Sequence, residues 1–361
     1  MKIGLVGLNQ TGKTTLFKLL TGRDSSAAAP GGKGPANIGS ALVPDERIDF
    51  LSALYKPKKT IYAKIELTDV AGFSVSDDAR NSGAAKFLND VRPCDALVHV
   101  LRAFESGSVI HDRGDIDPAR DLEDVETEML FADLEVIEKR IARIKAGKKV
   151  TKENEAEIEL LGRCYDRLEN GGTIRDMELS SEERVAVRNF AFLTDKPRLA
   201  VVNLDESQWE SGAFANEDAL RAMCSTLGIP LIMLCVETEL EISRLPQEDK
   251  SLFMEDMGIE QPGVAVLARA VYGLLGLISF LTVGEDEVRA WTIEDGTTAK
   301  KAAGKVHSDI ERGFIRADVV KYDSLKELGT MAKVREKGLF RLEGKEYIVI
   351  DGDIINFRFN V

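Results

Sequence analysis

One motif near the start of the chain constrains its fold more than any other segment. Gly7-Leu8-Asn9-Gln10-Thr11-Gly12-Lys13-Thr14 fits the pattern G-x-x-x-x-G-K-[ST], between an apolar run at Lys2–Gly7 and a helical pattern at Thr14–Leu20. Glycines let such a loop turn its N–H groups toward phosphate oxygens, and a helix N-terminus adds positive potential. The pattern predicts a phosphate-binding loop formed by Asn9, Gln10, Thr11, Gly12, Lys13, Thr14 and Thr15.

A second motif supports the first. Leu67-Thr68-Asp69-Val70-Ala71-Gly72 is typical of a strand that ends in D-x-x-G. We expect Lys13 to bridge the β- and γ-phosphates and to neutralise charge during reaction. Thr14 and Asp69 are the expected Mg²⁺ ligands, Asp69 through a water, and the Gly72 N–H would sense the γ-phosphate. Together the two motifs indicate a GTPase-like domain.

The segment expected to read the base departs from the guanine pattern. Asn203-Leu204-Asp205-Glu206 has the form N-x-x-E instead of N-K-x-D. In the usual pattern the Asp accepts hydrogen bonds from N1–H and the 2-amino group of guanine, and adenine offers neither. This favours ATP as the ligand and leaves a GTP-preferring enzyme as an alternative. The alternative is that Asn203 has no role in binding and only ends a strand and starts a turn.

The apolar pattern predicts a doubly wound α/β domain. Short buried strands are expected at Ile61–Leu67, Ala96–Leu101, Arg198–Val202 and Pro230–Cys235, separated by helical patterns. The Ala-, Gly- and Pro-rich segment Ser25–Gly39 is expected to be a mobile loop. Val264–Val283 predicts a buried helix that runs into a strand, not a membrane span.

Between Pro118 and Asp195 the α/β alternation stops, and apolar residues take heptad spacing on two helices. The residues concerned are Leu130, Leu134, Ile137, Ile141 and Ile144, then Ile158, Leu161, Tyr165 and Leu168. This pattern favours an inserted antiparallel hairpin over two ordinary amphipathic helices. From Ser279 onward we predict a β-rich domain with strands at Val288–Ile293, Ile315–Val320, Lys345–Ile350 and Ile354–Phe359. The predicted domains are residues 1–117 with 196–278, 118–195 and 279–361.

Charge limits the partners. The 361 residues carry a formal net charge of −13, which argues against a protein that coats nucleic acid, and no DNA partner is expected. Seven cations at the expected hairpin tip could form a local rRNA contact or simply a solvated face; they are Lys139, Arg140, Arg143, Lys145, Lys148, Lys149 and Lys152. Four scattered cysteines and the short N-terminal apolar run predict a reduced, cytoplasmic protein without a membrane association.

With these residues in place, the chain resembles the YchF / Obg-like ATPase family over its whole length. The resemblance includes the phosphate loop, VPDERIDFLSALYKPKK, TDVAG, NLDE and the C-terminal segments EVRAWTI, KVHSDIERGFIRADVV and RLEGKEYIVIDGDIINFRFNV. It implies an α/β P-loop NTPase domain with a doubly wound sheet, an inserted antiparallel coiled-coil hairpin and a C-terminal β-grasp-like TGS domain. It also implies ATP binding, slow Mg²⁺-dependent hydrolysis and ribosome association, with the TGS domain as a second expected contact to the ribosome or rRNA beside the hairpin tip.

The resemblance assigns further residues. Asn203, Leu204 and Glu206 match the family's base-reading motif, and Cys235 falls where backbone contacts to the base are expected. His111 matches a loop histidine proposed as catalytic, against the alternative of a solvated loop residue. Phe73 stands where Ras-type enzymes place a water-orienting Gln.

Both switch segments depart from the family. Lys33 replaces the Thr of the first switch, and Ala79–Ala85 replaces a Gly-rich run in the second. These departures raise the alternative of a divergent paralogue, a nucleotide-sensing ribosome-binding module with little or no hydrolysis.

Overall fold

The computed structural model describes residues 1–22, 37–70, 72, 82–107, 111, 113–147 and 151–360. The predicted switch positions Lys33 and Phe73 lie outside these residues, as do Lys148 and Lys149 of the basic tip. The chain divides into two compact units, residues 1–39 with 66–263 and residues 40–65 with 264–361. Residues 40–65, expected in the nucleotide-binding domain, therefore group with the C-terminal residues; the three-domain division itself stays a prediction.

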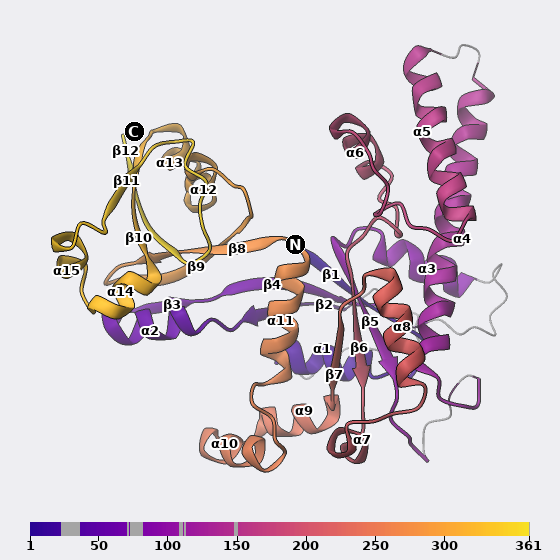
Figure 1. The fold of residues 1–361 in the computed structure, drawn as a ribbon, viewed down its shortest axis with the longest axis horizontal. Helices are drawn as coiled ribbons and strands as arrows, with labels where there is room; N and C mark the ends of the chain where they lie inside the picture. Colours follow the sequence, from indigo (N-terminus) through magenta and orange to yellow (C-terminus); the bar gives the residue numbers. More distant parts are fainter. Residues whose placement is uncertain are drawn as a thin grey trace. The chain divides into compact units, whose positions relative to one another are not determined.

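A six-stranded sheet, most of whose residues belong to the first unit, has the strand order β2-β4-β1-β5-β6-β7 (Figure 1). The strands are β1 (Lys2–Val6), β2 (Asn37–Val43), β4 (Ala63–Asp69), β5 (Ala96–Arg102), β6 (Arg198–Asn203) and β7 (Leu231–Leu234). β4, β1, β5, β6 and β7 pair in parallel, so their carboxyl ends share one edge. The predicted α/β class is confirmed. At that edge the phosphate loop follows β1, and Asp69 and Asn203 are the last residues of β4 and β6.

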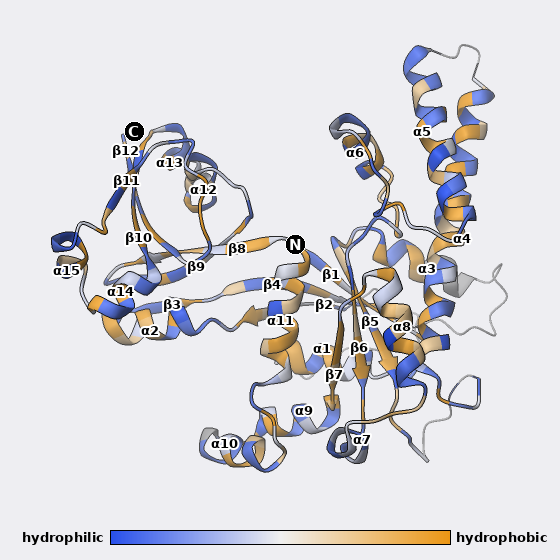
Figure 2. Ribbon diagram, in the orientation of Figure 1, coloured by the Kyte–Doolittle hydropathy of each residue, from blue (hydrophilic) through white to orange (hydrophobic). Residues whose placement is uncertain are grey.

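Helices cover the centre of this sheet because β5 and β6 are buried along their whole length. All seven residues of β5 are buried, as expected for a parallel strand covered on both faces. The orange colouring of the central strands in Figure 2 shows this continuous hydrophobicity. The helices of this part of the unit are α1 (Lys13–Thr21), α3 (Ser82–Val91), α7 (Glu206–Ser211), α8 (Glu217–Leu227), α9 (Val236–Arg244) and α10 (Gln247–Asp256).

The predicted helical hairpin is present. It consists of α4 (Pro118–Lys145) and α5 (Lys152–Glu169), with the short helix α6 (Ser181–Arg188) beside them (Figure 1). α4 begins where Asp117 caps its N-terminus and Pro118 takes the first turn. The helices bury a shared apolar cluster of Ile137, Leu160, Leu161, Cys164, Leu168, Ile174, Val187 and Phe192. Ile137, Leu161 and Leu168 are predicted heptad positions, and Leu160 and Cys164 each lie next to one.

A buried carboxylate fixes the base of the hairpin. Asp133 on α4 is fully buried and accepts hydrogen bonds from the backbone N–H groups of Leu193 and Thr194 and from the Thr194 hydroxyl. Arg92 pairs with the same carboxylate at 3.1 Å. The three bonds from Leu193 and Thr194 tie the chain that returns from the hairpin to α4, and Arg92 pairs the charge. A buried carboxylate is tolerated only when it is paired.

The second unit contains a mixed sheet with the order β11-β10-β12-β8-β9-β3. Its strands are β3 (Lys59–Ile61), β8 (Leu277–Val283), β9 (Glu287–Glu294), β10 (Phe314–Lys321), β11 (Arg341–Glu343) and β12 (Asp353–Phe359). Its helices are α2 (Glu46–Tyr55), α11 (Gly263–Leu274), α12 (Ala299–Val306), α13 (Ser308–Arg312), α14 (Tyr322–Leu328) and α15 (Met331–Glu336). The face of α12 that carries Ala299, Ala302 and Ala303 packs on three sheet residues, Phe280, Ile293 and Phe357. This helix therefore covers part of one face of the sheet.

Some local predictions were wrong. Lys345–Ile350 is not a strand: Ile348 forms only an isolated bridge, because the Asp353 carboxylate accepts from Ile350 N–H and Tyr347 and folds the segment into a turn. Residues 37–39 of the predicted loop belong to β2, and residues 23–36 lie outside the described ones.

Further expectations can be compared with the structure. The helix-to-strand prediction for Val264–Val283 is confirmed by α11 and β8. All four cysteines are buried free thiols. Within the described ranges, no helix combines the length and the hydropathy needed to cross a membrane.

Candidate functional site

The phosphate-loop motif forms a tight turn between β1 and α1. Gly12 has φ +96°, and a Cβ there would lie 2.3 Å from Nδ2 of Asn203, so only glycine fits. Gln10 also has positive φ, at +61°. Lys13 is 6% exposed and donates from Nζ to the carbonyl oxygens of Gly7 and Leu8. The amine therefore folds back over the loop, where a phosphate group would meet it.

The two expected metal ligands lie side by side. Thr14 donates its hydroxyl to Oδ2 of Asp69 at 3.1 Å. Burial raises the pKa of Asp69 above its ordinary value, while the Thr14 hydrogen bond and the charge of Lys13 oppose the shift. Among the residues that the structure describes, no group of three His, Cys, Asp or Glu side chains could hold a metal by itself. Two hard oxygens at this spacing fit Mg²⁺, which usually completes its shell with phosphate and water.

Gly72 lies against the same loop. A Cβ on Gly72 would stand 2.7 Å from Nζ of Lys13 and 2.9 Å from the backbone nitrogen of Asn9. The D-x-x-G segment thus returns to the phosphate loop in space, although Ala71 and residues 73–81 lie outside the described part of the chain. The structure brings Lys13, Thr14, Asp69 and Gly72 together, as the two motifs predict.

A cavity of about 500 Å³ adjoins the loop on the other side. Gly12 and Thr15 form its end at the loop, and its remaining walls come from the segments after β5, β6 and β7: Phe104, Glu105, Ser106, Asn203, Leu204, Asp205, Glu206, Ser207, Cys235, Glu237, Thr238 and Glu241. Asn203 joins the parts, because Nδ2 donates to the Thr11 carbonyl and Oδ1 accepts from the Val236 N–H, each at 3.2 Å. Asn203 therefore links the phosphate loop to the wall of the cavity through two hydrogen bonds.

The two neighbouring acidic residues of this cavity differ in what they bond. Asp205 caps α7: its side chain accepts from Gln208 N–H, from the Ser207 hydroxyl and from Glu105 N–H. Burial disfavours its ionisation, but these hydrogen bonds outweigh burial and lower the pKa of Asp205. Glu206 takes no part in this cap and contacts Thr238 instead, at 3.1 Å from Oγ1. Glu206 is therefore the acid available for a ligand.

His111 is buried, with 5% exposure, and both ring nitrogens face protein groups. Nε2 lies 2.8 Å from Oδ2 of Asp121, and Nδ1 accepts from Arg113 N–H at 3.2 Å. Burial raises the pKa of Asp121, opposed by the bonds from His111 and Arg120. His111 is thus no freely solvated loop residue, and these contacts connect it to the first turns of α4. Its catalytic role stays a prediction.

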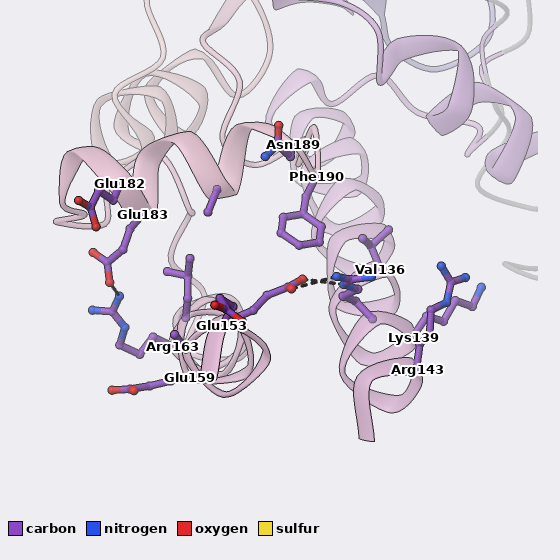
Figure 3. Close-up of a pocket in the computed structure, with 15 residues that line it drawn as sticks. Val136, Lys139, Arg143, Glu153, Glu159, Arg163, Glu182, Glu183, Asn189 and Phe190 are labelled. Atoms are coloured by element: carbon purple, nitrogen blue, oxygen red, sulfur yellow. Dashed lines mark hydrogen bonds and ion pairs between the residues drawn. The ribbon is translucent and has the colours of Figure 1, made fainter. Parts of the chain in front are cut away.

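Two of the seven cations at the hairpin tip are paired with acidic side chains in the structure. Arg140 makes two hydrogen bonds to Glu157 across the hairpin, at 2.6 and 2.9 Å, and Lys139 pairs with Glu135 one turn earlier. Arg143, Lys145 and Lys152 are exposed. A groove of about 990 Å³ runs between α4, α5 and α6, and Figure 3 shows Lys139 and Arg143 on its α4 side, with the Arg163–Glu183 pair opposite.

Sequence reasoning missed Thr238, Glu237 and the loop at Phe104–Ser106 as cavity residues. Phe104–Ser106 follows β5, and carboxyl ends of parallel strands meet at one edge, so strand order could have placed it there. Nothing in the local sequence singles out Thr238, because its part depends on Glu206, 32 positions away.

Comparison with known proteins agrees with this geometry. A family model described as a 50S ribosome-binding GTPase matches residues 2–139, and the model YchF-GTPase C-terminal, described as a protein of unknown function, matches residues 277–360. The fold and its loop thus define a P-loop protein of the GTPase class.

Full-length relatives narrow the class. The chain is 41% identical to the "Ribosome-binding ATPase YchF" of Bacillus subtilis, over 99% of both chains, and 39% identical to that of Escherichia coli O157:H7, over 100% of this chain and 99% of the other. The solved structure of the Schizosaccharomyces pombe YchF GTPase aligns with a TM-score of 0.85 at 28% identity, covering 99% of this chain and 97% of that one. The chain belongs to the YchF family, and the predicted family is confirmed.

Proposed function

We propose that this protein is a ribosome-associated ATPase that binds ATP with Mg²⁺ and hydrolyses it slowly to ADP and phosphate. One observation carries the proposal: the phosphate loop, the Thr14–Asp69 pair and the Glu206 cavity are parts of one site, joined by Asn203. The full-length relatives named ribosome-binding ATPases support the same activity. Ribosome association would place the protein in the cytoplasm.

Each end of the site has its own task. Lys13 would neutralise charge on the β- and γ-phosphates, and the backbone N–H groups of Asn9 to Thr15 would cradle them. Thr14 and Asp69 would hold Mg²⁺, which neutralises developing charge when bound. At the other end, Leu204 and Cys235 would flank the base, and Glu206 would accept a hydrogen bond from it.

The test is equilibrium binding of ATP and GTP under identical Mg²⁺. We expect ATP to bind more tightly than GTP, and Lys13→Ala to weaken ATP by roughly a hundredfold or more, since the variant has no ammonium group to bond the phosphates. Lys18→Ala, a substitution of the same kind on the same helix, should leave ATP affinity unchanged. A clear preference for GTP, or equal affinities of wild type and Lys13→Ala, would overturn the proposal.

Hydrolysis is tested separately by single-turnover release of phosphate. Wild type should exceed the Lys13→Ala variant clearly; if both match the uncatalysed background, the protein is a nucleotide-sensing module and not an enzyme. His111→Gln should slow hydrolysis more than it weakens ATP binding if the imidazole orients water. Equal losses in both would assign His111 only to the support of α4 through Asp121.

The ribosome contact is proposed at the hairpin tip. Arg143, Lys145 and Lys152 are exposed cations without an ion pair to any residue in the described part of the chain, on one end of a long protruding element. Exposed cations bind phosphate backbones in a salt-dependent manner. Co-sedimentation with ribosomes at low and high salt tests this, and a salt-independent contact would exclude the tip as its main source.

A further inference from the structure

We propose that Thr238 is a positioning residue of this site: its hydroxyl holds the Glu206 carboxylate so that the cavity selects a purine with an amino group at C6. This role rests on the proposed function, because it takes the cavity as the site of the base. Thr238 lies on the first turn of α9, is 8% exposed, and lines the same cavity as Glu206.

The contacts around Thr238 fix the direction of its hydrogen bond. Oγ1 lies 3.1 Å from Oε1 of Glu206 and 3.0 Å from Sγ of Cys235. Thr238 donates its single hydroxyl proton to Oε1 of Glu206, so the same hydroxyl can only accept from other groups. The Cys235 thiol must then donate to Thr238. Burial raises the pKa of Cys235, although bonds from Thr238 oppose it, so the thiol keeps the proton that this chain of hydrogen bonds requires.

This chain of hydrogen bonds matters because, among the residues that the structure describes, only Thr238 bonds to the Glu206 side chain. Its side chain is exposed, and a free glutamate would lose rotamer entropy on binding a base. The hydrogen bond from Thr238, which is itself bonded to Cys235, fixes the Glu206 side chain before the ligand binds. Less rotamer entropy is then lost on binding. Asp205 cannot take over, because its carboxylate already caps α7.

The occupied oxygen also sets which base fits. Guanine recognition by a carboxylate uses both oxygens, one for N1–H and one for the 2-amino group. Thr238 occupies one of the two acceptor sites of Oε1 and fixes the direction of the carboxylate, so that Oε2, with both of its sites open, is the oxygen placed to accept from the 6-amino group of adenine. A carboxylate facing that position would also repel the 6-carbonyl oxygen of guanine.

The experiment compares Thr238→Val and Thr238→Ser by equilibrium binding of ATP, GTP and purine riboside triphosphate, which lacks the 6-amino group. Valine keeps the shape and the backbone N–H of α9 but has no hydroxyl. We expect Thr238→Val to weaken ATP about five- to twentyfold and purine riboside triphosphate less than about twofold. Thr238→Ser should stay within about twofold of wild type for every nucleotide. Thr226→Val, on an exposed face of α8, is the matched control.

Equal weakening of ATP and purine riboside triphosphate by Thr238→Val would overturn the proposal, since the residue would then only support the cavity. An unchanged ATP affinity in Thr238→Val would overturn it as well. These outcomes differ from failure of the proposed function, in which wild type itself fails to prefer ATP over GTP.

Discussion

The phosphate loop and the hairpin tip are the two regions in which the sequence points most directly to chemistry, and they differ in what makes that chemistry. At the loop, backbone geometry and buried contacts build the site: Gly12 takes φ +96° against Asn203, and Lys13 is almost fully buried. At the tip, the described cations act through their side chains, and Arg143, Lys145 and Lys152 are exposed. Within the contiguous run of cations, two members are paired, with Glu135 and Glu157. A motif that fixes backbone geometry constrains its surroundings, whereas a charge run does not.

The largest effect should come from filling the space at Gly12. Gly12→Ala forces a Cβ to within 2.3 Å of Asn203 Nδ2, at a φ that L-residues rarely adopt. Asn203 must then move, which separates the loop from the base cavity. We expect at least about a hundredfold loss of ATP affinity, measured by titration with a fluorescent ATP analogue.

Gly22→Ala is the matched control for that loss. Gly22 also has a positive φ, at +61°, but nothing lies within 4 Å of its Cβ position. Strain there should cost about 1 kcal/mol of stability and leave ATP affinity unchanged. If Gly12→Ala binds ATP like Gly22→Ala, the loop is not the rigid element that the comparison assumes.

Asp69→Asn tests the proposed Mg²⁺ site beside the phosphate loop. The variant has no charged Mg²⁺ ligand at this position, so the gain in ATP affinity produced by Mg²⁺ should fall at least about tenfold. Asp90→Asn on α3 should keep that gain. A Mg²⁺ effect that survives in Asp69→Asn would place the metal elsewhere.

The pH dependence of the nucleotide-free protein gives a second readout. Burial raises the pKa of Asp69 in the folded state, so its contribution to stability is present at low pH and is lost as the pH rises through that raised pKa. Because asparagine does not ionise, Asp69→Asn does not lose stability in this way as the pH rises. The melting temperature of Asp69→Asn, measured without Mg²⁺ from acidic to neutral pH, should therefore exceed that of wild type most at neutral pH.

What the sequence could predict follows the same division. Parallel strands such as β5 read as continuous apolar runs, and the heptads of α4 and α5 indicate a hairpin, because burial imposes a period on each. Lys345–Ile350 also looks like a strand, yet the bonds that Asp353 makes to it outweigh its β-propensity. The Thr238–Glu206 contact joins the first turns of α9 and α7, which lie far apart in the sequence and which only the folded sheet brings together.

At the tip, the effect should be moderate and should depend on salt. Arg143→Ala with Lys145→Ala should weaken ribosome co-sedimentation severalfold at low salt. The slope of log affinity against log salt should fall by about 0.7–0.9 for each phosphate that the variant no longer binds. Lys59→Ala with Lys64→Ala removes two exposed cations from the other unit and serves as the control. Equal losses of ribosome affinity in both double variants would show that the tip contributes only through the net charge of the protein.

The smallest expected effect tests why the tip is weaker than its sequence suggests. Glu157→Gln removes the carboxylate that holds Arg140, whose side chain is 37% exposed in the pair. A partly exposed ion pair contributes about 0–1 kcal/mol, so unfolding should change little. The released guanidinium should raise ribosome affinity about twofold at low salt. Glu159→Gln, an exposed position on the same helix, makes the same change of net charge without releasing Arg140. A larger gain for Glu157→Gln than for Glu159→Gln would show that pairing, and not total charge, limits the tip; equal gains would show the reverse.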